Sequence, residues 1–278
     1  MYLNKLQQDD VFVTSRMTPL LDLIGMPSRR GLEQAIISNG KIVNIVSNSY
    51  GHMPNEEFFT KAEQLVADSN LHYQKQTINR NDRSFIMDVI IEDTDQFSTN
   101  DKDDKILPML RFKNSYDGSE KTSGHFGFYR KVCSNGLHVS ETKLAFSIRH
   151  GKNSAHLFLP KLNRLLERFL DKEFYSIVNK FDAMKSIEIM DTEAFVKDIL
   201  ERTKLFRFEC SDKNDSPSKK SREVIEILSH EAILLNEAPN LWLGYNTFNA
   251  VLHRTLKKTL SQQKKPDKVL FNEISNMV

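Results

Sequence analysis

The spacing of apolar residues changes part-way along the chain, and this change constrains the fold more than any other feature. Before Gly151, short apolar runs alternate with a period of two, as in half-buried strands, whereas after it they recur every three or four residues, as in helices. In KLAFSIR, Leu144, Phe146 and Ile148 lie on one side of such a strand. The pattern predicts an α+β fold, with a mainly antiparallel sheet in the N-terminal half and a helical C-terminal half. We expect a sheet domain over residues 1–152 and a helical region over residues 153–278, packed on the same core.

Local signals place the individual elements. Strands are expected at residues 42–46 and in HYQKQTI, SFIMDVII, ILPMLRF and HFGFYRKVC, and Asn135-Gly136 favours a tight hairpin turn after the last of these. A short helix should end near Gly25, and another should begin after Pro54 with Asn55 as its N-cap. Further helices are expected in REVIEILSHEAILL and LWLGYNTFNAVLHRTLKKTL, while CSDKNDSPSKKSRE is typical of a surface loop.

Charge and cysteine content narrow the class of protein. The net charge is only +2, but residues 105–131 hold six Lys/Arg against two acids, and an acidic run precedes them. Two distant cysteines argue against a disulfide framework or a zinc knuckle. No apolar run approaches the ~20 residues of a membrane span, and the N-terminus lacks the pattern of a signal peptide. We therefore expect a cytoplasmic protein with no membrane partner.

The segment RFKNSYDGSEKTSGHFGFYRKVCSNGLHV, residues 111–139, combines basic and aromatic side chains. Proteins that hold single-stranded nucleic acid pair a cationic groove for phosphates with aromatic faces on which bases stack. Ordinary packing is the competing explanation, with the aromatic residues in the core and the cations on the solvated side. The residues expected to contact nucleic acid, including a basic C-terminal cluster, are Arg111, Lys113, Tyr116, Tyr129, Arg130, Lys131, Arg149, Arg254, Lys257 and Lys258.

The same segment carries a motif with a known counterpart. NSYDGS followed by FYRKVCSNGL resembles the signature of a family found on phages and plasmids, the domain of unknown function 932. The motif-loop residues that match it are Asn114, Ser115, Asp117, Gly118, Cys133, Asn135 and Gly136, with Tyr116 where histidine is common. YGHMPNEEFF and LWLGYNTFNAVLHRTL are similar to flanking parts of that family. The resemblance implies a bacterial host and, because family members lie near recombination and replication genes, a role in DNA metabolism.

Three alternative sites deserve comparison with simpler explanations. The Asn114–Gly118 loop is either a structural turn, which such side chains favour, or an anion-binding loop. Cys133 lies near cations that would lower a thiol pKa, but nothing places a base against it. Asp88, Glu92 and the acids of residues 93–104 are more typical of a solvated loop than of a metal-dependent nuclease, and the eight histidines show no metal-ligand spacing.

The sequence thus favours binding over catalysis, without a cofactor or a metal. The hypothesis is a phage- or plasmid-type protein that binds or anneals single-stranded DNA in recombination or replication, and that forms a homo-oligomer by analogy with annealing proteins. The alternative hypothesis is a protein that binds and modulates a host protein, with the acidic segment imitating DNA.

Overall fold

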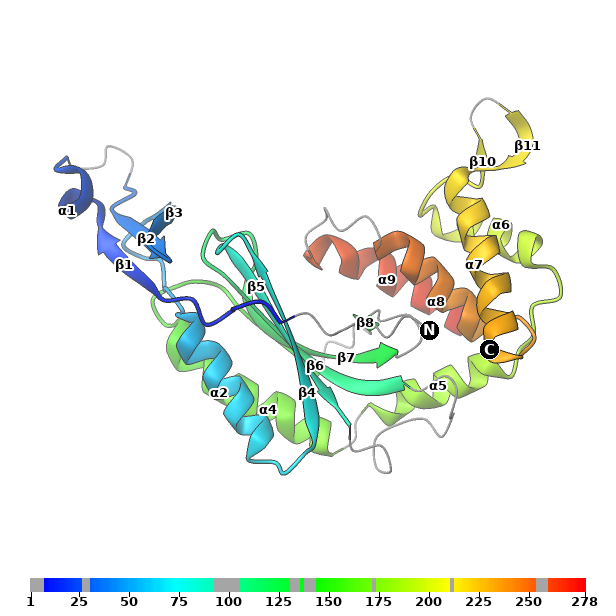
Figure 1. The fold of residues 1–278 in the computed structure, drawn as a ribbon, viewed down its shortest axis with the longest axis horizontal. Coiled ribbons are helices and arrows are strands. Elements are labelled where there is room, and N and C mark those ends of the chain that lie inside the picture. Colours follow the sequence, from blue (N-terminus) through cyan, green and yellow to red (C-terminus); the bar gives the residue numbers. More distant parts are fainter. Residues whose placement is uncertain are drawn as a thin grey trace. The chain divides into compact units, whose positions relative to one another are not determined.

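The chain divides into two compact units in a computed structural model. The model describes residues 8–26, 31–92, 106–130, 136–137, 144–171, 174–210, 213–253 and 260–278. Unit 1 comprises residues 1–98, 106–129 and 141–173, and unit 2 comprises residues 99–105, 130–140 and 174–278 (Figure 1). Unit 1 contains the two larger sheets, whereas unit 2 is mainly helical.

Unit 1 is built from two antiparallel sheets and three helices. The small sheet has the order β1-β2-β3, and the large sheet runs β4-β5-β6-β7, with β9 also paired to β7. The elements are β1 (Ser15–Pro19), α1 (Leu20–Ile24), β2 (Gln34–Ser38), β3 (Lys41–Val46), α2 (Asn55–Ala67), β4 (Tyr73–Arg80), β5 (Ser84–Ile91), β6 (Ile106–Ser115), β7 (Thr122–Arg130), β9 (Ala145–Ile148) and α4 (Ser154–Leu170). Arg130, the last residue of β7, is counted with unit 2.

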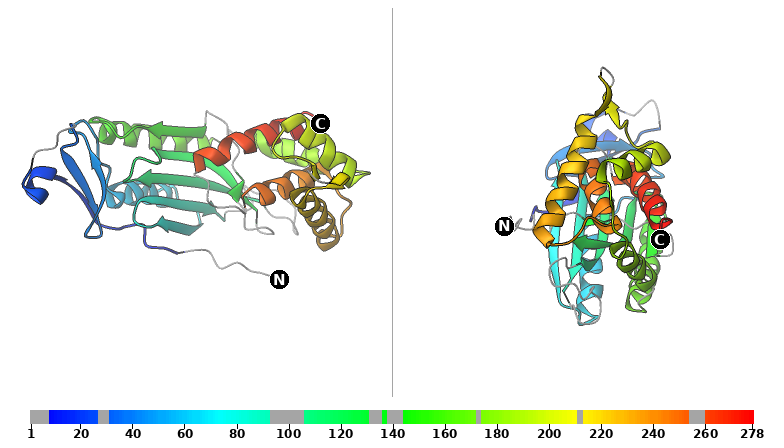
Figure 2. Two further views of the ribbon diagram at one scale, coloured as in Figure 1. Left: turned by 90° about the horizontal axis from the view of Figure 1, so that it is seen from above. Right: turned by 90° about the vertical axis from the view of Figure 1, so that its right-hand side faces the viewer.

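Helices α2 and α4 cover one face of the large sheet, as Figure 2 shows. Aromatic rings join the layers: Phe58 of α2 lies 6.3 Å from Phe112 of β6 and 4.8 Å from Phe158 of α4. Phe126 of β7 lies 5.8 Å from Phe169 at the other end of α4. Packed aromatic pairs contribute beyond the area that they bury, so this ring cluster is the core of unit 1.

Unit 2 is organised around one buried helix. Its elements are β8 (Gly136–Leu137), α5 (Tyr175–Lys185), α6 (Thr192–Thr203), β10 (Glu209–Cys210), β11 (Lys213–Pro217), α7 (Lys219–Leu235), α8 (Leu241–His253) and α9 (Leu260–Ser275). Every residue from 241 to 250 is buried, as expected for a helix surrounded by others. Trp242 contacts Phe181 of α5 with ring centroids 4.5 Å apart, and a Cβ at Gly244 would collide with the ring of Phe195 on α6. Glycine therefore permits the close approach of α6 to α8.

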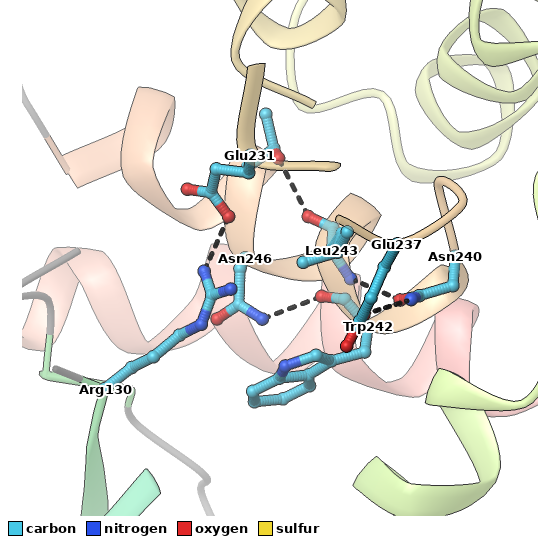
Figure 3. A network of polar contacts seen from close by, with 8 residues as sticks. Arg130, Glu231, Glu237, Asn240, Trp242, Leu243 and Asn246 are labelled. Atoms are coloured by element: carbon cyan, nitrogen blue, oxygen red, sulfur yellow. Dashed lines mark hydrogen bonds and ion pairs between the residues drawn. The ribbon is translucent and has the colours of Figure 1, made fainter. Parts of the chain in front are cut away.

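A buried ion pair lies inside unit 2 (Figure 3). The Nη1 atom of Arg130 lies 2.7 Å from Oε2 of Glu231 on α7, and its guanidinium stacks over the Trp242 ring at 5.8 Å. The Arg130 side chain is 1% exposed and that of Glu231 is 6% exposed. The buried charge of Arg130 is stable only while its carboxylate partner is present.

The oxygen of the Asn240 side chain caps α8 by accepting a hydrogen bond from Leu243 N at 3.0 Å.

The structure confirms the α+β class and the division into a sheet-rich first half and a helical second half. It differs in detail. The expected boundary at residue 152 falls between β9 and α4, and both belong to unit 1. Asn55 is wrong as the N-cap of α2, because Pro54 occupies that position and the Asn55 amide donates to Val11 O at 2.7 Å instead. Strands β1 and β2 were not expected, and β11 lies in the expected loop.

No helix in the described ranges of the chain is long and apolar enough to cross a membrane.

We predict that Glu231→Ala lowers the free energy of unfolding by about 3–5 kcal/mol, because it leaves the Arg130 charge buried without its carboxylate. Urea unfolding followed by circular dichroism measures this change. The control is Glu226→Ala, an exposed residue on the same helix, which should change stability by no more than about 0.5 kcal/mol. Equal effects of the two substitutions would show that the ion pair is not the stabilising feature.

Candidate nucleic-acid interface

The structure brings Arg111, Lys113 and Tyr129 to the same face of the large sheet. Arg111 and Lys113 alternate with Phe112 on β6, and Tyr129 packs against Met109, which lies two residues before Arg111 on that strand. All ten residues of β6 are nevertheless buried. Arg111 is 8% exposed and Lys113 is 2% exposed. The binding hypothesis requires both side chains to reach solvent, and neither does.

Register explains the burial of Arg111. Asp88 of β5 lies directly opposite Arg111. The Arg111 guanidinium donates two hydrogen bonds to the Asp88 carboxylate, from Nε to Oδ1 at 2.5 Å and from Nη2 to Oδ2 at 2.6 Å. A bidentate pair of this kind satisfies both groups inside the protein. The same pair removes Asp88 from any metal-binding cluster, and the Glu92 carboxylate accepts a hydrogen bond from Gln74 Nε2 at 2.6 Å.

Arg130 and the two tyrosines are also placed differently from the expectation. Arg130 lies on the same side of β7 as the buried Phe126 and Phe128, and Glu231 already holds its guanidinium. Tyr116 is fully buried, and its hydroxyl accepts a hydrogen bond from the main-chain N of Asn55 at 2.9 Å. Tyr129 is half-buried. A base cannot stack on the ring of Tyr116 in this arrangement.

Arg149 is the one expected phosphate contact that the described ranges show exposed to solvent. The remaining expected contacts and motif residues, together with most of the acidic segment, lie outside the described residues. These are Lys131, Arg254, Lys257, Lys258, Cys133, Asn135 and residues 93–104. Gly136 is described only as the first residue of β8.

Asn114, the first residue of the motif, is a buried hydrogen-bonding hub. Its Nδ2 donates to the main-chain oxygen of Met53 and to Oδ1 of Asn55, each at 2.8 Å, and its Oδ1 accepts from the Thr122 hydroxyl at 2.8 Å. The residue is 0% exposed. Asn114 thus joins β6 and β7 to the start of α2, which is a structural role.

The rest of the motif forms a hydrogen-bonded turn between β6 and β7. The Ser115 hydroxyl donates to Glu120 O at 2.8 Å and accepts from Glu120 N at 3.1 Å. Asp117 Oδ1 accepts from Ser119 N at 2.9 Å, and Gly118 adopts a φ of 74°, which favours glycine. These contacts account for Ser115, Asp117 and Gly118 without an anion, so of the two explanations the structural turn fits better.

Two loops enclose the buried Tyr116 with a cluster of polar rings. His52 lies 5.1 Å from the Tyr116 ring and 3.0 Å, through Nε2, from the Ser15 hydroxyl. Tyr50 stacks on His150 at 5.1 Å with an interplanar angle of 9°. A Cβ at Gly51 would overlap the carbonyl oxygen of Gly151, so glycine allows the two loops to touch.

Burial controls the protonation of this ring cluster. It lowers the pKa of His52 to about 4, with a further contribution from the positive charge of His150, and it also lowers the pKa of His150. It raises the pKa of Tyr116 to about 12. The rings are therefore neutral at pH 7, where they pack the motif turn against the loops around Gly51 and Gly151.

An exposed cationic site does occur in unit 1, between α4 and the strand β9. A groove of about 430 Å³ opens there, and we call it the basic groove. Its lining residues are Ala145, Phe146, Ser147, Lys161, Arg164, Leu165 and Arg168. No acidic residue among those that the structure describes lines it, and Arg149 follows two residues beyond Ser147.

Helix geometry explains why three cations meet in the basic groove. Positions 161, 164 and 168 are spaced three and four residues apart and therefore share one side of α4. Phe158, Leu162 and Phe169 on the neighbouring side bury the helix against the sheet. No ion pair joins Lys161 or Arg164 to a carboxylate within the described part of the chain. The sequence analysis did not predict these residues. Their helical spacing, which follows the strand KLAFSIR with its basic residues, could have indicated a cationic site.

Asn114→Ala should lower the free energy of unfolding by about 3 kcal/mol, since it breaks three buried hydrogen bonds and leaves their partners unpaired. Chemical denaturation gives the value. Ser119→Ala is the matched control from the exposed part of the same turn, and its effect should stay within about 0.5 kcal/mol. A neutral Asn114→Ala variant would contradict the structural role.

We also predict that stability falls as pH drops below 7. Because the pKa of His52 is lower in the folded than in the unfolded chain, its contribution is present above the unfolded value of about 6.5 and is lost as pH falls towards about 4. Between pH 7 and pH 5, the loss in free energy of unfolding that His52 causes should be about 1 kcal/mol after allowance for its partial exposure. Urea titrations at both pH values measure the loss, which His52→Gln should reduce. The exposed His156→Gln variant should keep the wild-type difference, and identical behaviour of the two variants would refute the assignment.

Comparison with known proteins identifies the family but no function. No curated protein and no solved structure matches the chain. One family model does match, that of a domain of unknown function (DUF932), and it spans residues 43–268. The match covers the motif turn, the basic groove and most of unit 2, as the resemblance of the motif indicated. The chain therefore belongs to the DUF932 family.

Proposed function

We propose that the protein binds single-stranded nucleic acid, most simply DNA, through the basic groove, without catalysing bond chemistry. The observation that carries the proposal is the concentration of Lys161, Arg164 and Arg168 along a groove whose described lining contains no acidic residue. Phosphate groups are the common ligands of cations that line an open groove, and contacts to phosphate supply most of the sequence-independent affinity of nucleic-acid-binding proteins. On this proposal the protein acts in the cytoplasm of a bacterial host, in phage or plasmid recombination or replication.

The form of the groove favours one strand over a duplex. Its volume of about 430 Å³ lies within the range of small-ligand sites and accommodates a short stretch of sugar–phosphate backbone. Strand β9 pairs with β7 along one edge, and within the described residues no strand pairs with its other edge. Main-chain N–H groups on such an edge can donate to phosphate oxygens alongside the cations.

Phosphate contacts, rather than base stacking, support the proposal. Phe146 is the aromatic residue of the groove, but it is only 8% exposed and packs towards Phe158. The ring therefore offers little surface for a base. We accordingly propose binding with weak sequence preference and strong salt dependence. In this proposal the cations of α4 take the place of Tyr116 and Tyr129, which the sequence hypothesis expected to contact the nucleic acid.

The test is the affinity of the purified chain for a labelled oligothymidylate longer than about 16 nucleotides, measured by fluorescence anisotropy at several salt concentrations. Three phosphate contacts give a slope of log K against log salt of about −2, or a loss of about 20-fold between about 50 and 200 mM salt. Lys161→Ala with Arg164→Ala should weaken binding at low salt and reduce the magnitude of the slope by about 1.4.

A matched control separates the groove from the general positive charge of the protein. Lys219→Ala with Arg222→Ala removes the same two residue types at the same spacing from exposed positions of α7. This control should bind as the wild type does. Equal weakening of both variants, or a wild-type affinity indifferent to salt, would refute the groove as the binding site. Duplex DNA and single-stranded RNA of equal length complete the comparison.

A further inference from the structure

One short connection joins the two walls of the basic groove. Strand β9 ends at Ile148 and helix α4 begins at Ser154, so residues 149–153 link the walls, and we call them the β9–α4 connection. Within it, Gly151 N donates to Arg149 O at 2.8 Å, and Ser154 N donates to Gly151 O at 2.9 Å. The connection is therefore a tight turn, and its position bears on how β9 and α4 face each other across the groove.

His150 attaches this connection to the turn that carries the family motif. Its Nε2 atom lies 3.2 Å from the main-chain oxygen of Glu120. Because a carbonyl oxygen only accepts hydrogen bonds, Nε2 of His150 carries the proton and donates it. The same oxygen accepts a hydrogen bond from the hydroxyl of Ser115, a motif residue, at 2.8 Å. One carbonyl group thus joins the family motif to the β9–α4 connection.

Two further contacts hold the connection within unit 1. The ring of Tyr50 stacks on that of His150 with centroids 5.1 Å apart. A Cβ at Gly51 would lie 1.9 Å from the Gly151 carbonyl oxygen, so the main chains of the two loops are in direct contact. Neither Tyr50 nor Glu120 lines the groove, and each can act on it only by positioning the connection.

We propose that His150 is a positioning residue for the basic groove, which it couples to the family motif through the Glu120 carbonyl. The inference rests on the proposed function of the groove. Lys161 and Arg164 lie on one wall and β9 forms the other, so a strand can contact both only while the walls keep their separation. The hydrogen bond from His150 fixes the connection that sets this separation. The motif thereby acts on binding, although none of its described residues lines the groove.

The first test compares two substitutions of His150. His150→Phe removes the hydrogen bond to Glu120 but keeps a ring for Tyr50 to stack on. It also removes Nδ1, a buried atom with no hydrogen-bond partner among the described residues, so the urea midpoint of unfolding should stay close to that of the wild type. Its affinity for oligothymidylate, measured by fluorescence anisotropy, should nevertheless fall about 2- to 30-fold, as is typical of residues that act on a site without contacting its ligand.

His150→Gln provides the rescue, because its side-chain amide can donate to the same carbonyl oxygen. This variant should bind more tightly than His150→Phe and within about 2-fold of the wild type. The matched control is His156→Phe, the same substitution at an exposed position of α4 that does not line the groove. It should bind as the wild type does, and circular dichroism verifies that every variant is folded.

The second test contains no nucleic acid. Trypsin cleaves after Arg149 and Lys152, which are exposed residues of the β9–α4 connection. Release of the connection in His150→Phe should raise the rate of cleavage at these two sites about 5-fold, as expected when local opening costs one hydrogen bond less. His150→Gln should be cleaved at the wild-type rate. Mass spectrometry of the fragments assigns the sites.

Three results overturn the inference: His150→Phe binds as tightly as the wild type, His150→Gln is as weak as His150→Phe, or cleavage after Arg149 and Lys152 is unchanged in His150→Phe. A wild type that binds no oligothymidylate refutes the proposed function and this inference with it. If the wild type binds and Lys161→Ala with Arg164→Ala weakens binding but His150→Phe does not, the proposed function stands and only this inference fails.

Discussion

A guanidinium group removed from water must be paired, and two buried arginines of the described chain, one in each unit, meet this requirement with a carboxylate. Arg111 is held by Asp88 across neighbouring strands of unit 1, and Arg130 is held by Glu231 inside unit 2. In each case the paired carboxylate offsets the energetic cost of removing the charge from water. Both arginines were expected to bind phosphate, but each forms an ion pair within the protein. Phosphate would have to displace a buried ion pair to reach either of them.

This constraint separates the family motif from the candidate site. Asn114 and Ser115 satisfy main-chain groups of neighbouring elements, and Gly118 provides a left-handed turn. Tyr116 packs against His52, and His150 stacks on Tyr50 in the same ring cluster. The motif thus holds β6, β7 and the loops of unit 1 in position. The groove that carries exposed cations lies elsewhere, between β9 and α4.

Several predictions from sequence were correct for physical reasons that can be named. The alternation of Leu144, Phe146 and Ile148 required one buried face of a strand, and all three residues are buried. On α4, Phe158 and Phe169 lie against the sheet for the same reason, because they share the apolar side of that helix. On β7, alternation places Arg130 on the side of the buried Phe126 and Phe128, where its charge needs a carboxylate partner. Arg111 and Arg130 were expected to reach phosphate because each is a basic residue on a strand, but both are buried, and Asp88, 23 positions away, and Glu231, 101 positions away, pair with them.

The sequence by itself determined the classes of element, their order and the family, because periodicity, turn residues and motif letters are local properties of the chain. Only the tertiary structure decided which cations are buried in ion pairs and which line an open groove. That choice depends on which strand lies beside which, and on which carboxylate the fold delivers to each guanidinium. Arg111 and Arg164 are the same residue type in the sequence, but one faces Asp88 across a strand pair and the other lines an open groove. Burial and pairing arise from long-range contacts, and these do not exist until the chain has folded.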